Sequence, residues 1–206
     1  MTNPKVEVKG VERKGIFSSN ANFSSRLFTD YADIKKLVHH CRGLGWRIVL
    51  TQGTYDMVHI GHARYLELAK RKGDFLVVGI DSDEKVRFRK GPERPVVPES
   101  ERLEMLCHLR SVDAVFLKEL KHPKWGLIKA IRPDVLIATK ETYDKKRLNS
   151  LREFCGEIIV LEPMATTSTS AKIRRLQIGT ADKLAKTLTP KLLKVIEESL
   201  GELKDK

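Results

Sequence analysis

The chain has 206 residues, of which 41% are hydrophobic and 32% are charged, the proportions of a globular protein. It contains no run of 18 apolar residues, and its first ten residues lack the apolar stretch of a signal peptide, so neither a transmembrane helix nor a secretory leader is expected. The formal net charge of +12 favours polyanionic partners such as a nucleoside triphosphate or a phosphorylated substrate, whereas dispersed basic residues and only 6% aromatic residues disfavour nucleic acid.

The first 45 residues are predicted to form an N-terminal extension. It contains a Ser/Asn-rich stretch, "FSSNANFSS", that we expect to be mobile, followed by one helix in "DYADIKKLVHHCRGLG". Residues 179–206 are predicted to form a helical tail, with Thr189 as the N-cap of a helix and Pro190 in its first turn. The apolar stripe of this tail would either close the core or pair with a second subunit.

Residues 46–178 alternate between short apolar runs and helical patterns, which predicts one α/β domain. Strands are expected at 47–50, 75–80, 114–117, 135–138 and 158–161. The intervening helices are expected at 62–73, 99–112, 124–131 and 145–156. The predicted fold is therefore a Rossmann-like, doubly wound parallel sheet of five strands. In such a sheet a ligand binds at the carboxyl ends of the strands, so polar segments that follow strands are the candidate site.

The segment after the first strand, "TQGTYDMVHIGH", is suited to binding phosphate. Gly53 allows close approach of the backbone, and a helix amino terminus supplies free N–H groups. His59 and His62 lie three residues apart and project the same way, and Gly61 leaves space between them. The alternative is two structural histidines, one of them capping the helix.

This segment resembles the first motif of the nucleotidyltransferase superfamily of the cytidylyltransferase-like type, G-x-F-D-x-x-H-x-G-H, with Tyr55 in place of Phe. Class I aminoacyl-tRNA synthetases share half of this motif, but they also need a KMSKS loop, which is missing here. The segment "SDEKVRFRKGPERPVVPESER" is similar to that of sugar-phosphate nucleotidyltransferases, above all heptose-1-phosphate adenylyltransferases, and glycerol-3-phosphate cytidylyltransferases share its layout. The matching positions are Ser82, Asp83, Lys90, Gly91, Arg94, Pro95, Pro98 and Arg102. A third segment, "TSTSAKIRR", resembles the Ser/Thr-rich turn that binds triphosphate in this family.

The resemblance implies an enzyme of the H-x-G-H nucleotidyltransferase type, with Mg²⁺ as cofactor and a homodimeric assembly. The implied catalytic residues are His59, His62 and Lys90. Asp56 is expected to brace its loop rather than perform acid–base chemistry. The implied nucleotide-binding residues are Thr51, Gly53, Thr54, Tyr55, Gly61, Arg87, Arg102, Ser168, Thr169 and Ser170. The candidate acceptor-binding residues are Asp81, Arg94 and Lys140, and no protein ligand to a metal is predicted.

The predicted reaction transfers a nucleoside monophosphate from a triphosphate to a sugar phosphate or phosphorylated polyol and releases pyrophosphate. ATP is favoured, because "EPMAT" stands where cytosine-specific relatives have R-T-E-G-I. A CTP-dependent enzyme acting on glycerol-3-phosphate or a similar phospho-alcohol is one alternative, since "TKETYD" after the fourth strand matches neither branch. A non-catalytic nucleotide- or RNA-binding protein is the alternative from another class.

Three widely separated cysteines indicate neither a disulfide framework nor a metal site and favour the cytoplasm.

Overall fold

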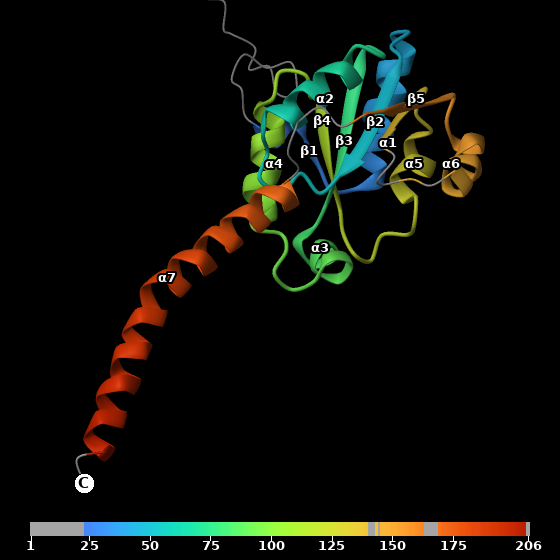
Figure 1. Ribbon diagram of the computed structural model, residues 1–206. Coiled ribbons are helices and arrows are strands. Elements are labelled where there is room, and N and C mark those ends of the chain that lie inside the picture. Colours follow the sequence, from blue (N-terminus) through green and yellow to red (C-terminus); the bar gives the residue numbers. More distant parts are fainter. Residues whose placement is uncertain (1–22, 140–142, 144, 163–168, 205–206) are drawn as a thin grey trace, which may run out of the picture. The chain divides into compact units, whose positions relative to one another are not determined.

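The structure is a computed structural model that describes residues 23–139, 143, 145–162 and 169–204 (Figure 1). The chain divides into two compact units, Met1–Met164 and Ala165–Lys206. The first unit contains a sheet of six strands in the order β1-β4-β3-β2-β5-β6. The strands are β1 (Leu27–Phe28), β2 (Ile48–Gly53), β3 (Phe75–Asp81), β4 (Ala114–Lys118), β5 (Val135–Thr139) and β6 (Glu157–Leu161).

All five strand pairings are parallel, as the alternating pattern predicted. The predicted number of strands was wrong, because the N-terminal extension supplies the edge strand β1, whose Leu27 pairs with Val115 of β4. β2 pairs with β3 on one side and with β5 on the other. Strand order therefore reverses between β2 and β5, and in open α/β sheets such a reversal marks the ligand crevice.

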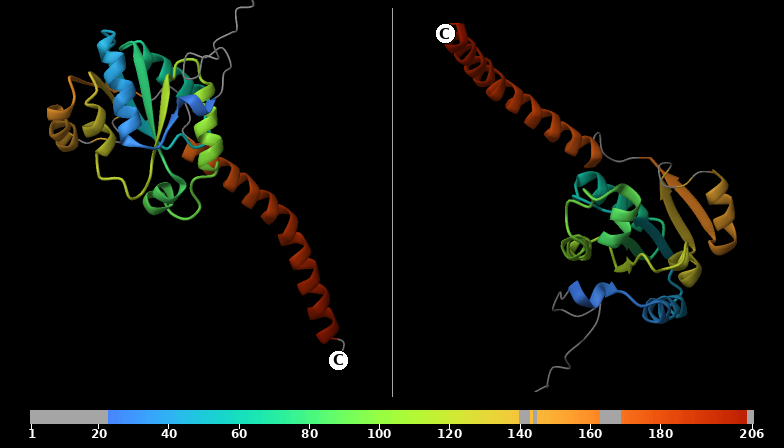
Figure 2. Two further views of the ribbon diagram at one scale, coloured as in Figure 1. Left: turned by 180° about the vertical axis from the view of Figure 1, so that it is seen from behind. Right: turned by 90° about the horizontal axis from the view of Figure 1, so that it is seen from below.

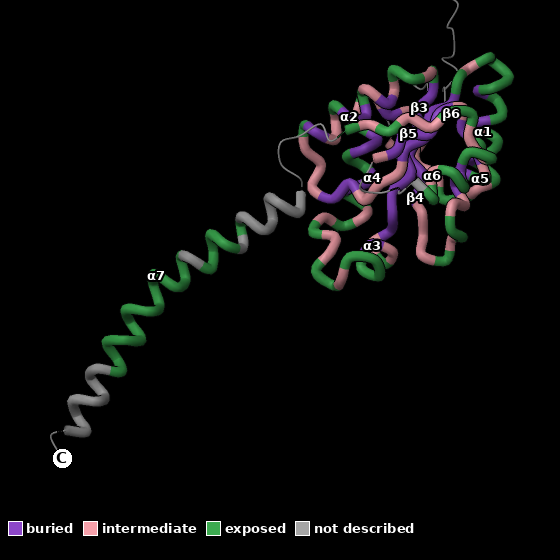
Figure 3. The backbone as a smooth tube through the Cα atoms, turned by 45° about the vertical axis from the view of Figure 1, so that its right-hand side comes forward, coloured by how far each residue is buried: buried purple, intermediate pink, exposed green. Residues whose placement is uncertain are grey.

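Helices cover both faces of the sheet (Figure 1 and Figure 2). In the first unit they are α1 (Tyr31–Gly43), α2 (Ile60–Lys70), α3 (Asp83–Lys90), α4 (Glu99–His108), α5 (Gly126–Ile131) and α6 (Lys145–Leu151), with 3-10 turns η1 (Phe23–Arg26) and η2 (Arg152–Phe154). Buried side chains of α1 and α5 pack on one face of the strands, and those of α2 and α4 pack on the other. Strand residues alternate between these two clusters, because successive side chains of a strand point to opposite faces. The central strands are accordingly buried on both sides (Figure 3).

Helix α3 was not predicted, because the segment after β3 was interpreted as a polar loop. It has clear helix-end signals: the Ser82 hydroxyl accepts the Lys85 N–H, and acidic residues occupy the first turn. It ends at Gly91, whose φ of 93° lies in the left-handed region that glycine tolerates. Only Val86 is buried, so the helix has too few apolar residues to show a helical period.

In the second unit the described residues form one helix, α7 (Thr169–Lys204). The predicted helix start at Thr189 is wrong, because Pro190 lies inside α7. Proline removes one backbone donor from a helix, and the sequences on both sides of it are rich in Leu, Lys, Ala and Glu, which favour helix. The helix also runs through residue 178, where the sequence placed the end of the α/β domain. None of the helices in the described residues is long and apolar enough to cross a membrane.

Candidate active site

The loop between β2 and α2 has an unusual backbone. Tyr55 and Met57 have φ angles of 52° and 51°, a conformation that costs free energy for residues other than glycine. Tyr55 is buried, and a Cβ atom at Gly53 would lie 2.9 Å from the Cε2 atom of its ring. Gly53 is therefore required by the packing of Tyr55. The close approach of Gly53 to phosphate remains a prediction. The predicted nucleotide contacts of Thr54 and Tyr55 also remain predictions.

The two motif histidines face each other at the start of α2. The Gly61 N–H donates to Nδ1 of His59 (3.1 Å), and the His59 N–H donates to Nδ1 of His62 (3.3 Å). The two rings lie 4.1 Å apart, centroid to centroid. Because each Nδ1 accepts a hydrogen bond, we assign the proton of each neutral ring to Nε2. The pair thus presents Nε2–H donors beside the positive end of the α2 dipole, where developing negative charge would be stabilised.

Thr51 lies deeper in the fold than its predicted contact with the nucleotide requires. It is fully buried in β2, and its hydroxyl is 2.8 Å from the Tyr65 hydroxyl on α2. Burial raises the pKa of Tyr65 to about 12. The geometry favours a packing role for Thr51, which ties α2 to the strand that precedes it.

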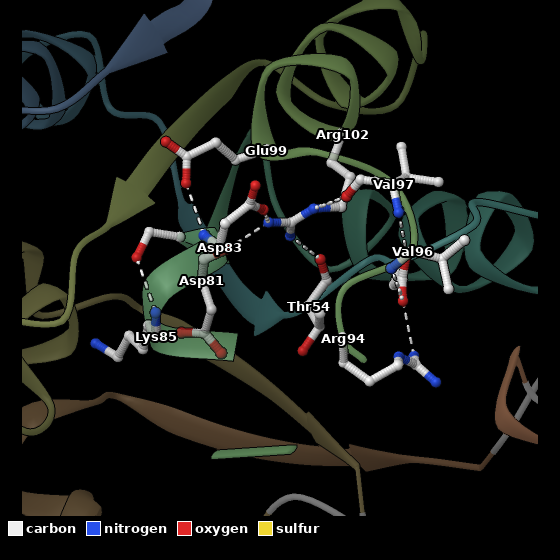
Figure 4. A network of polar contacts seen from close by, with 11 residues as sticks. Thr54, Asp81, Asp83, Lys85, Arg94, Val96, Val97, Glu99 and Arg102 are labelled. Carbon is white, nitrogen blue, oxygen red and sulfur yellow. Dashed lines mark hydrogen bonds and ion pairs between the residues drawn. The ribbon is translucent and has the colours of Figure 1, made fainter. Parts of the chain in front are cut away.

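Arg102 on α4 is 1% exposed and joins four segments of the chain (Figure 4). Its Nε donates to the Val97 carbonyl (2.9 Å), and its Nη1 donates to the Thr54 carbonyl. Its Nη2 donates to the Asp81 carbonyl (3.0 Å) and to the Asp83 carboxylate (2.7 Å). All three guanidinium nitrogens are therefore engaged inside the protein. This arrangement favours a structural role over the predicted contact with triphosphate.

Asp56 fastens the α3–α4 loop, residues 91–98, to the histidine loop, residues 54–59 between β2 and α2. Its carboxylate accepts the N–H groups of Val96 (3.1 Å) and Val97 (3.0 Å). It also forms an ion pair of 2.8 Å with Arg94, whose side chain is 15% exposed. This agrees with the expected bracing role of Asp56. The predicted acceptor residue Arg94 is thereby held at the same edge of the sheet.

Cationic side chains gather on the last turn of α3, beside this loop. They are Arg87, Arg89 and Lys90, and all three reach solvent with part of the side chain. The pKa of Lys90 is lowered, first by partial burial and then by the nearby charges of Arg94 and Arg89. Such a group of cations suits phosphorylated reactants.

The predicted acceptor residue Asp81 is buried at the end of β3. It pairs with Arg89 (2.6 Å) and with Lys118 (2.9 Å), the last residue of β4. Sequence reasoning missed Lys118, although its position directly after the predicted strand 114–117 was a usable signal.

Of the other predicted residues, Lys140 and Ser168 lie outside the described residues, and Thr169 and Ser170 open α7 in the second unit.

The donor set does not fit a dedicated metal site. Among the described residues there is no group of three His, Cys, Asp or Glu side chains able to hold an ion. Asp56, Asp81 and Asp83 are each paired with a cation. Mg²⁺ commonly keeps several water ligands and binds through substrate phosphates, so here it would come as part of the nucleotide substrate.

A groove of about 580 Å³ lies between the start of α3, the start of α4 and the residues after β4. Its lining residues are Ser82, Asp83, Glu84, Arg87, Pro98, Glu99, Ser100, Glu119 and Lys121. Carboxylates outnumber cations in this lining, so it does not suit a triphosphate.

A family model described as cytidylyltransferase-like matches residues 50–181, which is more than half of the chain. The bifunctional protein HldE of Methylobacillus flagellatus is 41% identical over 142 residues, which cover 68% of this chain and 29% of that protein. The corresponding protein of Wolinella succinogenes is 35% identical over 162 residues, which cover 79% of this chain and 34% of that protein. The chain thus spans about a third of the length of these curated relatives.

Two solved structures share the fold. The lipopolysaccharide core biosynthesis protein from Thermoplasma volcanium superposes with a TM-score of 0.52 at 24% identity, covering 59% of this chain and 100% of that chain. The pantoate-beta-alanine ligase from Francisella tularensis gives a TM-score of 0.55 at 15% identity, covering 79% of this chain and 78% of that chain.

Proposed function

Because the chain belongs to the cytidylyltransferase-like family, we propose that it is a nucleotidyltransferase acting on a nucleoside triphosphate and a sugar phosphate or phosphorylated polyol. The observation that carries the proposal is the pair of imidazoles held by the capping hydrogen bonds of α2. They follow β2, next to the point where strand order reverses. The similarity to the HldE proteins over most of this chain supports the same class of activity.

In the proposed reaction a phosphate oxygen of the acceptor attacks the α-phosphorus of the triphosphate. A new P–O bond forms while the bond from the α-phosphorus to the bridging oxygen breaks, and that electron pair leaves with pyrophosphate. No protein nucleophile takes part. Catalysis consists of positioning and charge stabilisation.

Residues on two sides of the site would provide this positioning and charge stabilisation. The Nε2–H groups of His59 and His62 would donate to the α-phosphate and the bridging oxygen, and the amino terminus of α2 would add its dipole. Lys90 and Arg87 would neutralise the transferring phosphates from the end of α3. Mg²⁺ would reduce the charge of the triphosphate that enters with it.

We favour ATP over CTP as the nucleotide. Support comes from the resemblance of the segment "KGPERPVVPESER" to that of adenylyl-transferring enzymes and from the similarity to the HldE proteins. Thermal unfolding with Mg²⁺ and either ATP or CTP distinguishes the two, because a ligand at 100 times its Kd stabilises the folded state by about 2.7 kcal/mol. A higher Tm with CTP alone would refute the adenylyl assignment and leave the transferase proposal standing.

Pyrophosphate release tests the activity itself. Each of the four NTPs is combined with a panel of sugar 1-phosphates and with glycerol-3-phosphate, and the expected result is acceptor-dependent release. Salt-sensitive RNA binding without release would instead favour a binding protein.

A homodimer and a cytoplasmic location are further parts of the proposal. The assembly is checked by a size measurement in solution, and a monomer would contradict it. A reducing compartment suits the thiols of Cys41, Cys107 and Cys155, which are free. Burial raises the pKa of Cys107 and Cys155 to about 11, so both stay protonated near neutral pH.

A further inference from the structure

Four charged side chains form a cluster at the carboxyl ends of β3 and β4, and the proposed chemistry assigns no task to any of them. Asp81 is its centre, 2% exposed and paired with Lys118 and Arg89. Lys85, one turn earlier on α3 than Arg89, completes it and donates from Nζ to the Glu119 carbonyl (3.2 Å). We call Asp81, Lys85, Arg89 and Lys118 the β3–β4 cluster.

Positive charge is in excess in this cluster. Arg89 and Lys118 are both paired with the Asp81 carboxylate, whose charge also acts on Lys85, whereas the carboxylate of the adjacent Glu119 lies 2.6 Å from Lys121. Burial and the neighbouring cations lower the pKa of Lys118, and burial followed by the charge of Arg89 lowers that of Lys85. An anion placed here would relieve the repulsion among the cations and repay part of the cost of burying them.

The β3–β4 cluster lies close to the proposed reaction centre. Gly53 of β2 pairs with Ile80 of β3, so Asp81 is level with Thr54, the first residue of the histidine loop. The guanidinium of Arg102 donates to the carbonyls of both residues. Since neighbouring strands are about 4.8 Å apart, the cluster is one to two strand spacings, or about 5–10 Å, from that loop. A small acceptor can span this separation.

We propose that the β3–β4 cluster binds a second acidic group of the acceptor, a carboxylate or phosphate distant from the phosphate that attacks the nucleotide. This inference rests on the proposed function. Arg89, whose side chain is 50% exposed, and the partly buried Lys85 supply the hydrogen-bond donors that the ligand reaches. Lys118, 12% exposed, supplies positive charge from behind. The enzyme therefore selects sugar phosphates that carry two anionic groups.

The experiment compares acceptors that differ only at carbon 6. Glucose, galactose and mannose 1-phosphates are each tested as the parent sugar, as the uronic acid and as the 6-phosphate, with pyrophosphate release as the readout. If the second acidic group makes one charge-assisted hydrogen bond to the cluster, kcat/KM for an acidic form should exceed that of its parent sugar by about 10- to 100-fold. A preference for the uronic acid would identify the second acidic group as a carboxylate, and a preference for the 6-phosphate would identify it as a phosphate.

Two substitutions connect that preference to the cluster. Lys85→Gln and Arg89→Gln are each expected to reduce it about tenfold, the equivalent of one such contact. Lys72→Gln removes an exposed lysine just after α2 and should leave it unchanged. Equal kcat/KM for parent and acidic forms would overturn the inference while the proposed function stands. A preference that survives both cluster substitutions would also overturn it.

Thermal unfolding with the same sugars separates this inference from the proposed function. Without turnover on any acceptor, stabilisation by an acidic form that is lost in Lys85→Gln would support the cluster as a binding site and refute the transferase proposal. Neither turnover nor such stabilisation would refute both.

Discussion

Replacing Arg102 with lysine tests whether this residue clamps the loops or binds the triphosphate. The guanidinium reaches three carbonyls and one carboxylate. A single ammonium group on a shorter side chain can keep the ion pair with Asp83 and one carbonyl, which leaves two buried carbonyls without a donor. Each such loss costs about 1–3 kcal/mol, so the free energy of unfolding should fall by about 2–6 kcal/mol. For a chain of this size each kcal/mol lowers Tm by about 2–4 °C, which gives a decrease of about 4–24 °C.

Urea unfolding monitored by circular dichroism measures this loss, with the KM for the nucleotide determined in parallel on the folded variant. Arg110→Lys is the matched control, because Arg110 is exposed and should change the free energy of unfolding by less than about 0.5 kcal/mol. Unchanged stability together with a raised nucleotide KM in Arg102→Lys would refute the structural role of Arg102 and favour its predicted contact with the triphosphate.

The other predictions concern the reaction and the loop. His62→Ala should lower turnover by about 10²–10³-fold, the cost of one preorganised donor, whereas His108→Ala, at an exposed position, should not; full turnover in a folded His62→Ala protein contradicts the mechanism. Because the pKa of Lys90 is lowered from 10.5, its charge is lost as pH rises through a value below 10.5, and kcat/KM should fall there. Lys90→Arg should move that decrease to higher pH, since arginine stays charged, and an unmoved pH profile would exclude Lys90 as its cause. Asp56→Asn should lower the free energy of unfolding by about 3 kcal/mol, because it breaks a buried ion pair with Arg94, and chemical denaturation would show no such loss if the pair were unimportant.

The central strands were predictable from sequence because they are buried on both faces and consist of continuous apolar runs, as in "FLVVGI". Strand β1 has only two residues, and its partner β4 lies far along the chain, so no local pattern marks it. Pro190 was misleading for a different reason. A proline is favourable in the first turn of a helix and costs about 3 kcal/mol in the interior, so the pattern favoured a helix start, whereas the strong helix formers on both sides of Pro190 continue α7 through it.

In the candidate site, local geometry was predictable and long-range geometry was not. His59 and His62 interact within one helical turn, so their spacing alone predicts that they meet. The partners of Arg102 include residues 48, 21 and 19 positions away, and only the fold brings them to one guanidinium. A motif match therefore marked Arg102 as important without distinguishing a ligand contact from an internal clamp.

The short edge strand β1 has a consequence for how the chain folds during synthesis. Leu27 and Phe28 pair with Val115 and Phe116, and Arg26 donates to the Cys107 carbonyl 81 residues away. At about 5–20 residues per second, the ribosome needs about 4–18 s to make the chain between the two strands. Throughout that interval β1 lacks its hydrogen-bonding partner, so it joins the sheet only after β4 has emerged. Its contacts form late, and we expect substitutions in β1 to speed unfolding of the finished sheet more than they slow folding.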